Sequence, residues 1–229
     1  ALAREHGVAT LPELVITQGE WKSDREALLR AVAAFANEHT ATGALIGKPA
    51  AHGSSIGMKI AHTSADWADA VDEALRFGDR AMLEPYLERA RELEVAVLER
   101  TDGTVQAFGP GEVIPGREFY DYDAKYAPGV SRTTTSSDLP AALADEMRAA
   151  AVALFAAAQS RGLSRMDFLM ARSGERAGRW YLSEVNTFPG FTPISLFPAL
   201  VMSGGASFTQ LCVELVAAAA ARPAPRSTR

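Results

Sequence analysis

The segment MDFLMARSGERAGRWYLSEVN, residues 166–186, is the stretch of this chain that decides the fold. Two apolar runs of strand length flank a polar tip with two glycines, which is typical of a β-hairpin. Successive side chains of a strand point to opposite faces, so Arg165 shares a face with Asp167, and Glu184 shares a face with Asn186. If the hairpin pairs its two strands, we expect these polar groups to converge.

This set of side chains is suited to a divalent cation. Two carboxylates and an amide oxygen, without a nearby His or Cys, favour Mg²⁺ or Mn²⁺ over zinc. Arg165 beside them would stabilise developing negative charge. The alternative is a solvated strand edge that carries a structural ion pair between Arg165 and Asp167.

Composition limits the classes of partner. The chain has 229 residues, 48% hydrophobic and 22% charged, as in a globular protein of one large or two smaller domains. A net charge of -5 argues against a nucleic-acid surface. No apolar run approaches the ~20 residues of a membrane span, so we expect no membrane partner. The single Cys212 cannot form a disulfide within the chain, which favours a reducing compartment, and we expect a cytoplasmic protein.

Helices and strands follow from periodicity and from Gly/Pro signals. Helices are predicted over residues 23–39, 63–78, 136–162 and 207–221, the first with a capping box between Ser23 and Glu26. Strands are predicted over residues 13–17, 44–50, 57–62, 81–87, 93–100, 105–115, 164–172 and 179–186. A turn at Asp102 and Gly103 indicates a second hairpin. Consecutive hairpins with helices packed on them predict an α+β fold of antiparallel sheets, divided into residues 1–87 and 88–229.

A glycine- and serine-rich loop stands in GKPAAHGSSIGMK, residues 47–59. Such a loop between two strands can direct backbone N–H groups at phosphate, and Lys48 could add a positive charge. The loop is not a Walker A motif, because Pro49 follows the lysine where that motif has Ser or Thr. The alternative is a plain hairpin turn.

Two further segments carry candidate ligand-binding residues. In MLEPYLERARELEV, residues 82–95, a strand ends at Glu84 in a hinge across which a nucleotide base could lie, and Glu92 could accept ribose hydroxyls. In FYDYDAKY, residues 119–126, Lys125 could reach phosphate and Tyr126 could bond a reacting group. The alternatives are surface charges on a connector for the first segment and a packed aromatic loop for the second. The long aperiodic stretch around the second segment indicates a functional loop.

In this order, the segments resemble the D-alanine–D-alanine ligase family of the ATP-grasp superfamily. The matching stretches are GKPAAHGSSIGM, LEPYLERARELEVAVL, EFYDYDAKY, GLSRMDFLM and YLSEVNTFPGFTPISLFP. The last contains the pattern E-x-N-T-x-P-G-F-T-x-x-S, which is close to diagnostic. The resemblance implies an ATP-grasp fold of two α+β subdomains, mainly antiparallel, that enclose the nucleotide. Residues 1–87 would be the central lid subdomain and residues 88–229 the C-terminal subdomain.

The family reaction joins two D-alanines. ATP phosphorylates the carboxylate of the first, and the amine of the second attacks the acyl phosphate through a tetrahedral intermediate. The product feeds peptidoglycan synthesis. The partners implied are therefore ATP, D-alanine and two Mg²⁺ or Mn²⁺ ions, and we also consider a homodimer.

The resemblance assigns a role to each matching residue. The ATP-binding residues would be Lys48, Gly53, Ser54, Ser55, Gly57, Glu84, Leu87, Glu92 and Lys125, with Glu94 as an alternative to Glu92 for the ribose. The metal ligands would be Asp167, Glu184 and Asn186, with Glu184 bridging. Arg165 and the Gly190 N–H would form the oxyanion site, and Ser54 and Tyr126 would lie near the first substrate. Ser195, the Leu196 N–H and Gly190 would serve the second substrate.

One departure from the family concerns its N-terminal domain. That domain precedes the region matched here and supplies part of the first substrate site, and we find no counterpart in these residues. We therefore expect either a cut-out or a natural short form. The alternatives to D-alanine ligation are another acceptor, such as D-lactate or another amino acid, and a nucleotide-binding fragment that is inactive alone. Tyr126 resembles the D-alanine-using enzymes more than the D-lactate users.

Overall fold

The computed structural model describes residues 1–53, 55–115, 131–192 and 195–221. These residues form two compact units. The small unit is Leu11–Arg89, and the large unit combines Ala1–Thr10, Ala90–Ile114 and the described residues from Arg132 onward. The boundary after Arg89 lies two residues from the division expected at residue 87, but residues 1–10 group with the large unit instead of the small one.

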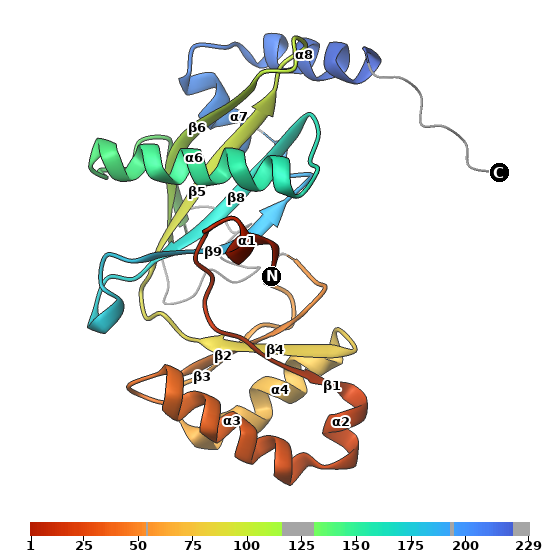
Figure 1. Cartoon of the computed structure of the whole chain (residues 1–229), viewed down its shortest axis with the longest axis vertical. Helices are drawn as coiled ribbons and strands as arrows, with labels where there is room; N and C mark the ends of the chain where they lie inside the picture. The colour runs from red at the N-terminus through yellow and green to blue at the C-terminus, as the bar shows by residue number, and fades with distance from the viewer. Residues whose placement is uncertain (54, 116–130, 193–194, 222–229) are drawn as a thin grey trace, which may run out of the picture. The chain divides into compact units, whose positions relative to one another are not determined.

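The small unit is a four-stranded antiparallel sheet with helices (Figure 1). Its strands have the spatial order β1-β4-β2-β3. The elements along the chain are β1 (Leu14–Thr17), α2 (Gln18–Ser23), α3 (Arg25–His39), β2 (Leu45–Pro49), β3 (Lys59–Ala61), η1 (Ser64–Asp66), α4 (Trp67–Arg76) and β4 (Arg80–Pro85).

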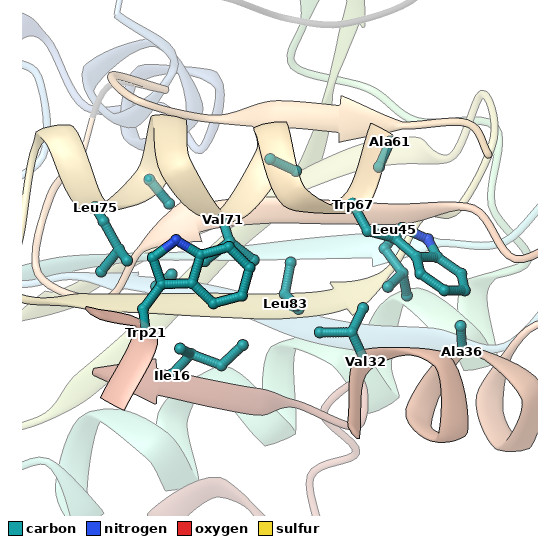
Figure 2. Close-up of a cluster of buried hydrophobic side chains, with 13 residues drawn as sticks. Ile16, Trp21, Val32, Ala36, Leu45, Ala61, Trp67, Val71, Leu75 and Leu83 are labelled. Atoms are coloured by element: carbon teal, nitrogen blue, oxygen red, sulfur yellow. The ribbon is translucent and has the colours of Figure 1, made fainter. Parts of the chain in front are cut away.

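A cluster of buried side chains joins the sheet of the small unit to its helices. Figure 2 shows Val71 and Leu75 of α4 and Val32 of α3 meeting strand residues that include Ile16 and Leu83. Because side chains alternate along each strand, the residues between these core positions face the other way. The helix-free face of the sheet therefore presents Lys48 and Glu84.

The expected capping box at Ser23 and Glu26 is wrong. Ser23 is the last residue of α2, and Asp24 caps α3 by accepting the Ala27 N–H at 2.9 Å. A capping box does occur one helix earlier, where Thr17 and Glu20 satisfy each other's N–H groups. The sequence pattern did not predict the short helix α2. Because α2 includes Ser23, the N-cap of α3 is Asp24 instead.

The large unit is a five-stranded sheet with the order β7-β6-β5-β8-β9. Its elements are α1 (Leu2–Glu5), β5 (Arg91–Glu99), β6 (Val105–Pro115), β7 (Ser131–Thr134), α6 (Ala141–Ala157), β8 (Leu163–Met170), η2 (Gly174–Arg176), β9 (Trp180–Asn186), α7 (Leu196–Ser203) and α8 (Phe208–Ala220). The expected hairpins β5–β6 and β8–β9 are both confirmed as antiparallel pairs. The α+β class with antiparallel sheets is therefore confirmed.

Helix α6 crosses one face of this sheet (Figure 1). Phe155 of α6 is buried in the same cluster as Val95 of β5 and Met166 and Phe168 of β8. This face uses the odd-numbered residues of β5 and the even-numbered residues of β8, so Glu94, Arg165 and Asp167 lie on the opposite face. The fold thus packs α6 on one face, whereas the other face carries these polar side chains and is covered in part by Leu196 and Leu200 of α7, next to Gly111 of β6.

Two elements of the large unit were not predicted. The edge strand β7 lies in the stretch without a clear period, and α7 is a short helix with five of its eight residues buried. A helix that is apolar all round has no amphipathic signal. Within the described residues, no single helix meets the length and apolarity of a membrane span, and α7 and α8 meet them only together, across a bend of 102°.

Candidate functional site

Polar residues from three strands meet on the face of the large sheet opposite to α6. In the strand register, Glu94 of β5 stands opposite Asp167 of β8, and Asp167 stands opposite Glu184 of β9. One step along, Arg165 stands opposite Asn186. The register shifts just beyond Asp167, so Ser183 is an extra residue on β9. The convergence expected from the hairpin is confirmed.

Asp167 is the centre of the hydrogen bonds in this group. Arg165 donates from Nε to Asp167 Oδ1 and from a terminal nitrogen to Oδ2, both at 2.7 Å. Asn186 Nδ2 donates to Asp167 Oδ2 at 2.9 Å. Because the amide nitrogen faces Asp167, the amide oxygen of Asn186 points away and can serve as a ligand. The side chains of Arg165 and Asp167 are 17% and 20% exposed, so their ion pair is not a solvated strand edge.

The electrostatic balance of the group is negative. Burial alone would lower the pKa of the Arg165 guanidinium, but the charge and hydrogen bonds of Asp167, with the charges of Glu94 and Glu184, outweigh it and raise that pKa. Arg165 therefore stays protonated at any working pH. Three carboxylates close to one guanidinium leave an excess of negative charge that a divalent cation would offset.

The ligand chemistry fits Mg²⁺ held jointly with phosphate. Within the part of the chain that the structure describes, no group of three or more His, Cys, Asp or Glu side chains is arranged to hold a metal. Asp167 and Glu184 therefore do not form part of a closed protein cage of such ligands. Mg²⁺ ordinarily binds one or two carboxylates and takes its other ligands from phosphate and water. Two carboxylates and the Asn186 amide oxygen meet that requirement.

The turn that follows β9 is held by Ser195. The Thr192 N–H donates to Ser195 Oγ at 3.0 Å, the two hydroxyls lie 2.9 Å apart, and the Ser195 N–H donates to the Thr192 carbonyl at 2.9 Å. A Cβ atom on Gly190 would lie 2.9 Å from Ser195 Oγ. A side chain at position 190 would displace the Ser195 hydroxyl, so glycine there lets Ser195 lie against its backbone.

Ser195 is also the N-cap residue of α7. Its side chain does not cap the helix, because Thr192 engages the hydroxyl. Leu196 is the first residue of the helix, where backbone N–H groups lack intrahelical acceptors. Such a terminus favours a carboxylate. The structure thus places Gly190, Ser195 and Leu196 next to one another, and their roles toward the second substrate stay predictions. Thr192 is a neighbour to which the sequence analysis gave no role.

In the small unit, Lys48 and Glu84 form a second polar group. Ile46 is paired with Glu84, and Lys48 is two residues further along β2 on the same face. Lys48 Nζ lies 2.6 Å from Glu84 Oε2, and both side chains are largely buried. Two residues that the sequence assigned to the nucleotide therefore form a direct ion pair on the helix-free face of this sheet.

The loop between β2 and β3 contains the predicted phosphate-binding glycines. Gly57 has φ +72°, and a Cβ there would lie 2.6 Å from the Phe77 ring, so only glycine fits. Ser55 also has a positive φ, 58°. The Gly53 carbonyl accepts the Ile56 N–H at 3.3 Å, which makes a tight turn. The remaining predicted loop residues, Ser54, Lys125 and Tyr126, lie outside the described residues.

Two residues predicted to contact the nucleotide lie after the end of β4, one before β5 and one near its start. Leu87 follows the end of β4 and is half-buried, and Glu92 is on β5 opposite Leu169 and Val113. Glu94, considered as the alternative ribose ligand, lies 3.1 Å from Arg165 and next to Asp167. Its place beside the guanidinium is, like that of Thr192, a feature of the large-unit site that the sequence did not indicate. The only sequence signal was its two-residue spacing from Glu92.

Comparison with known proteins gives consistent matches. The family model described as "D-ala D-ala ligase C-terminus" matches residues 2–217. A D-alanine--D-alanine ligase of Heliobacterium modesticaldum is 37% identical over 216 residues, covering 94% of this chain and 56% of the relative. The structure of D-alanyl-alanine synthetase A from Vibrio cholerae has a TM-score of 0.78 at 30% identity, covering 93% of this chain and 61% of that one. VanG D-Ala:D-Ser ligase from Enterococcus faecalis has a TM-score of 0.77 at 25% identity, covering 94% and 58%.

Proposed function

Because this chain belongs to the D-ala D-ala ligase C-terminus family, we propose that it is the portion of a D-alanine–D-alanine ligase that binds ATP, divalent metal and the second substrate. The chain spans 56% of the length of the Heliobacterium relative. The complete reaction is therefore proposed for the whole ligase: ATP activates the carboxylate of one D-alanine as an acyl phosphate, and the amine of a second D-alanine attacks it. The observation that carries this proposal is the convergence of Arg165, Asp167, Glu184 and Asn186 just before the Gly190–Ser195 turn.

Arg165 is suited to stabilise the tetrahedral intermediate. An arginine has five N–H donors, and Arg165 commits its Nε edge to Asp167. The remaining N–H donors of Arg165, together with the Gly190 N–H, would donate to a developing oxyanion. Donors fixed before the reaction stabilise such charge without reorganising. Asp167 thus orients the arginine while it also serves as a metal ligand.

Asp167, Glu184 and the Asn186 oxygen would hold two divalent ions, with Glu184 as the bridge. When bound, the ions neutralise the transferring phosphoryl group, for which positioning and electrostatics supply most of the catalysis. Lys48 would bind the phosphates and Glu84 the adenine, after their ion pair opens. The loop glycines Gly53 and Gly57 would cover the phosphates with Ser54 and Ser55, Lys125 would also bind phosphate, and Leu87 and Glu92 would contact the adenine and the ribose.

The second substrate would dock at the start of α7. Its carboxylate would accept hydrogen bonds from Ser195 Oγ and the Leu196 N–H, and Thr192 fixes the Ser195 rotamer. This arrangement binds a carboxylate and makes no contact that distinguishes the side chain of the acceptor. A D-serine acceptor is therefore the second candidate, supported by the match to a D-Ala:D-Ser ligase. We place the enzyme in the cytoplasm, with ATP and D-alanine as partners.

Calorimetry tests the nucleotide part of the proposal. We expect ATP to bind the folded chain in the presence of Mg²⁺ and to bind far more weakly after EDTA is added. A folded sample that gives no heat with ATP and Mg²⁺ would contradict the proposal. Mass spectrometry of products formed with D-alanine, D-serine or D-lactate as acceptor then distinguishes the ligase types, and ATP binding without any product supports a nucleotide-binding role for this chain alone.

A further inference from the structure

Thr192 and Ser195 form a pair of hydroxyls in the turn that follows β9. The Thr192 N–H donates to Ser195 Oγ at 3.0 Å, and the two hydroxyl oxygens lie 2.9 Å apart. Thr192 is exposed and Ser195 is half-buried, so a ligand in solution can reach them. Although Ser195 is the N-cap residue of α7, its hydroxyl does not cap the helix. Among the described residues, the hydrogen bonds of this hydroxyl therefore go to Thr192.

The two lone pairs of Ser195 Oγ decide which ligand this hydroxyl can bind. A serine hydroxyl has one O–H donor and two acceptor lone pairs, and the Thr192 N–H occupies one of the lone pairs. The contact between the two hydroxyls can run in either direction. When Ser195 donates to Thr192, only a lone pair is left for a ligand. When Thr192 donates to Ser195, both lone pairs are filled and the Ser195 O–H is left for a ligand.

A carboxylate can use only the second arrangement. An ionised carboxylate accepts hydrogen bonds and donates none, so it requires the Ser195 O–H. The Thr192 hydroxyl then has to donate to Ser195 Oγ, and hydrogen bonds in such a chain strengthen one another. A primary amide carries both a donor and an acceptor and is therefore served by either arrangement.

We propose that Thr192 is a positioning residue that holds the Ser195 hydroxyl as a donor toward the carboxylate of the second substrate. The inference rests on the proposed role of Ser195. Thr192 acts through Ser195 and not on the substrate itself. Because its hydroxyl fills the second lone pair of Ser195 Oγ, the turn favours an acceptor with a free carboxylate over the corresponding amide.

The test is a titration of the full 229-residue chain with D-alanine, followed by NMR at the Leu196 amide. Thr192→Val removes the hydroxyl and keeps the backbone N–H and the branched shape of the side chain. We expect the Kd for D-alanine to rise about tenfold in T192V. Thr192→Ser keeps the hydroxyl, and we expect it to restore the Kd to within about twofold of the unmodified chain. Equal Kd values in the unmodified chain and T192V, or no recovery in T192S, would overturn the proposal.

Two further measurements separate positioning from a general loosening of the turn. The Ser195 N–H donates to the Thr192 carbonyl at 2.9 Å, which does not involve the Thr192 side chain, so this amide should exchange its hydrogen at the same rate in T192V. D-alaninamide lacks the carboxylate, and its Kd should change less than about twofold in T192V. Faster exchange, or an equal weakening of both ligands, assigns the effect to the turn as a whole and overturns the proposal. If D-alaninamide binds too weakly to measure, the comparison of T192V with T192S decides.

Thr104→Val is the matched control. The Thr104 N–H and hydroxyl both donate to one side-chain oxygen, Asp102 Oδ1, at 2.9 and 2.7 Å, in the turn between β5 and β6. This turn repeats the bonding pattern of Thr192 at a place to which no ligand is assigned. We expect T104V to bind D-alanine as the unmodified chain does, and a loss equal to that of T192V would count against Thr192.

Failure of the proposed function gives a different result. If D-alanine leaves the Leu196 amide resonance of the unmodified chain unshifted, the second-substrate site is itself rejected, and the proposal with it. If D-alanine binds there and T192V makes no difference, only the role of Thr192 is rejected.

Discussion

At the residue scale, burial decides what each polar side chain contributes. The Arg165–Asp167 pair is largely buried and bonded at both carboxylate oxygens, so it is part of an organised site. Ser164, next to Arg165 in sequence, points to the opposite face of β8 and is fully buried. Within the described residues, its hydroxyl has no hydrogen-bond partner. Neighbours in sequence thus differ because one face of the strand is used for chemistry and the other for packing.

Ser164→Ala should stabilise the large unit. An unpartnered buried hydroxyl carries a desolvation cost of about 1–3 kcal/mol, so we expect a gain of about 1 kcal/mol in the free energy of unfolding. Urea unfolding measures the change. Ser207→Ala is the control of opposite sign, because Ser207 Oγ accepts the Gln210 N–H at the start of α8 and its removal should cost about 1 kcal/mol. A loss of stability in S164A would mean that the hydroxyl is satisfied in solution.

At the element scale, polar contacts join residues of helices and strands that are far apart in sequence. Local sequence patterns do not predict which of these side chains meet. Asp72 of α4 accepts hydrogen bonds from Trp21 of α2 at 2.7 Å and from Arg25 of α3 at 2.7 Å. In the large unit, Glu112 of β6 accepts two hydrogen bonds from Arg91 of β5, at 2.9 and 2.6 Å. Each pair joins neighbouring elements and gives a separate test of stability.

Asp72 should make the small unit sensitive to acid. Burial would raise the pKa of the Asp72 carboxyl, but the hydrogen bonds from Arg25 and Trp21 outweigh it and lower that pKa. Its stabilising contribution is therefore complete above the unfolded pKa of about 3.9 and is lost as pH falls through the lower folded value. We expect Asp72→Asn to cost about 1 kcal/mol or less at neutral pH, because the side chain is 43% exposed.

Urea unfolding at neutral pH and at about pH 2 measures this dependence, and the gap between D72N and the unmodified chain should close in acid. Asp69→Asn is the control, since Asp69 is on the same helix, more exposed, and pairs only with Lys59 at 3.2 Å among the contacts described. A gap that is constant with pH would contradict the assigned role of the Asp72 charge.

Glu112→Gln should destabilise the large unit strongly. The charge of Glu112 is buried beside Arg91, and its hydrogen bond is the largest cause of the raised pKa of Arg91, against a lowering by burial. Removing Glu112 leaves the buried Arg91 with an exposed carboxylate, Asp138 at 2.6 Å, as its remaining partner, and we expect a cost of about 3 kcal/mol. The double variant R91M/E112M should recover most of that loss, because two apolar side chains need no partner. Thermal unfolding of the three proteins measures both effects, and equal losses in E112Q and the double variant would contradict this account.

At the scale of the whole molecule, the chain belongs to the D-ala D-ala ligase C-terminus family and spans 56% of the length of its Heliobacterium relative. Ligand binding to the folded state alone raises stability, by about 2.7 kcal/mol at a ligand concentration one hundred times Kd. Stability in the presence of Mg²⁺ and ATP is therefore a readout of the proposed site that does not require turnover.

Glu184→Gln should remove most of the Mg²⁺-dependent part of this stabilisation. If Glu184 is the metal ligand proposed above, loss of its charge should weaken metal binding, whereas stability without ligand should change little because Glu184 is exposed. Glu175→Gln, at the exposed tip of the same hairpin, is the matched control and should behave as the unmodified chain. Urea unfolding with and without Mg·ATP gives the comparison. A full Mg²⁺ response in E184Q would remove Glu184 from the metal site.

Local patterns in the sequence predicted most of the strands and hairpins of this protein and which side chains share a strand face. Period-two alternation placed Arg165 and Asp167 on one face of β8, and Glu184 and Asn186 on one face of β9, and the polar tip predicted their hairpin. These features depend on neighbours within a few residues, so one strand or one turn determines them. The glycine and proline residues between Asn186 and Ser195 likewise indicate a turn.

Only the tertiary structure decided which distant segments meet. Glu94 reaches Arg165 because β5 lies between β6 and β8, and residues 1–10 join the large unit because the Leu182 N–H of β9 donates to the Ala9 carbonyl at 2.8 Å. Strand order and register depend on the packing of whole sheets, and no short window of sequence contains that information. The alternation of side chains determined the separate halves of the site, and the order of the strands brought Glu94 to them.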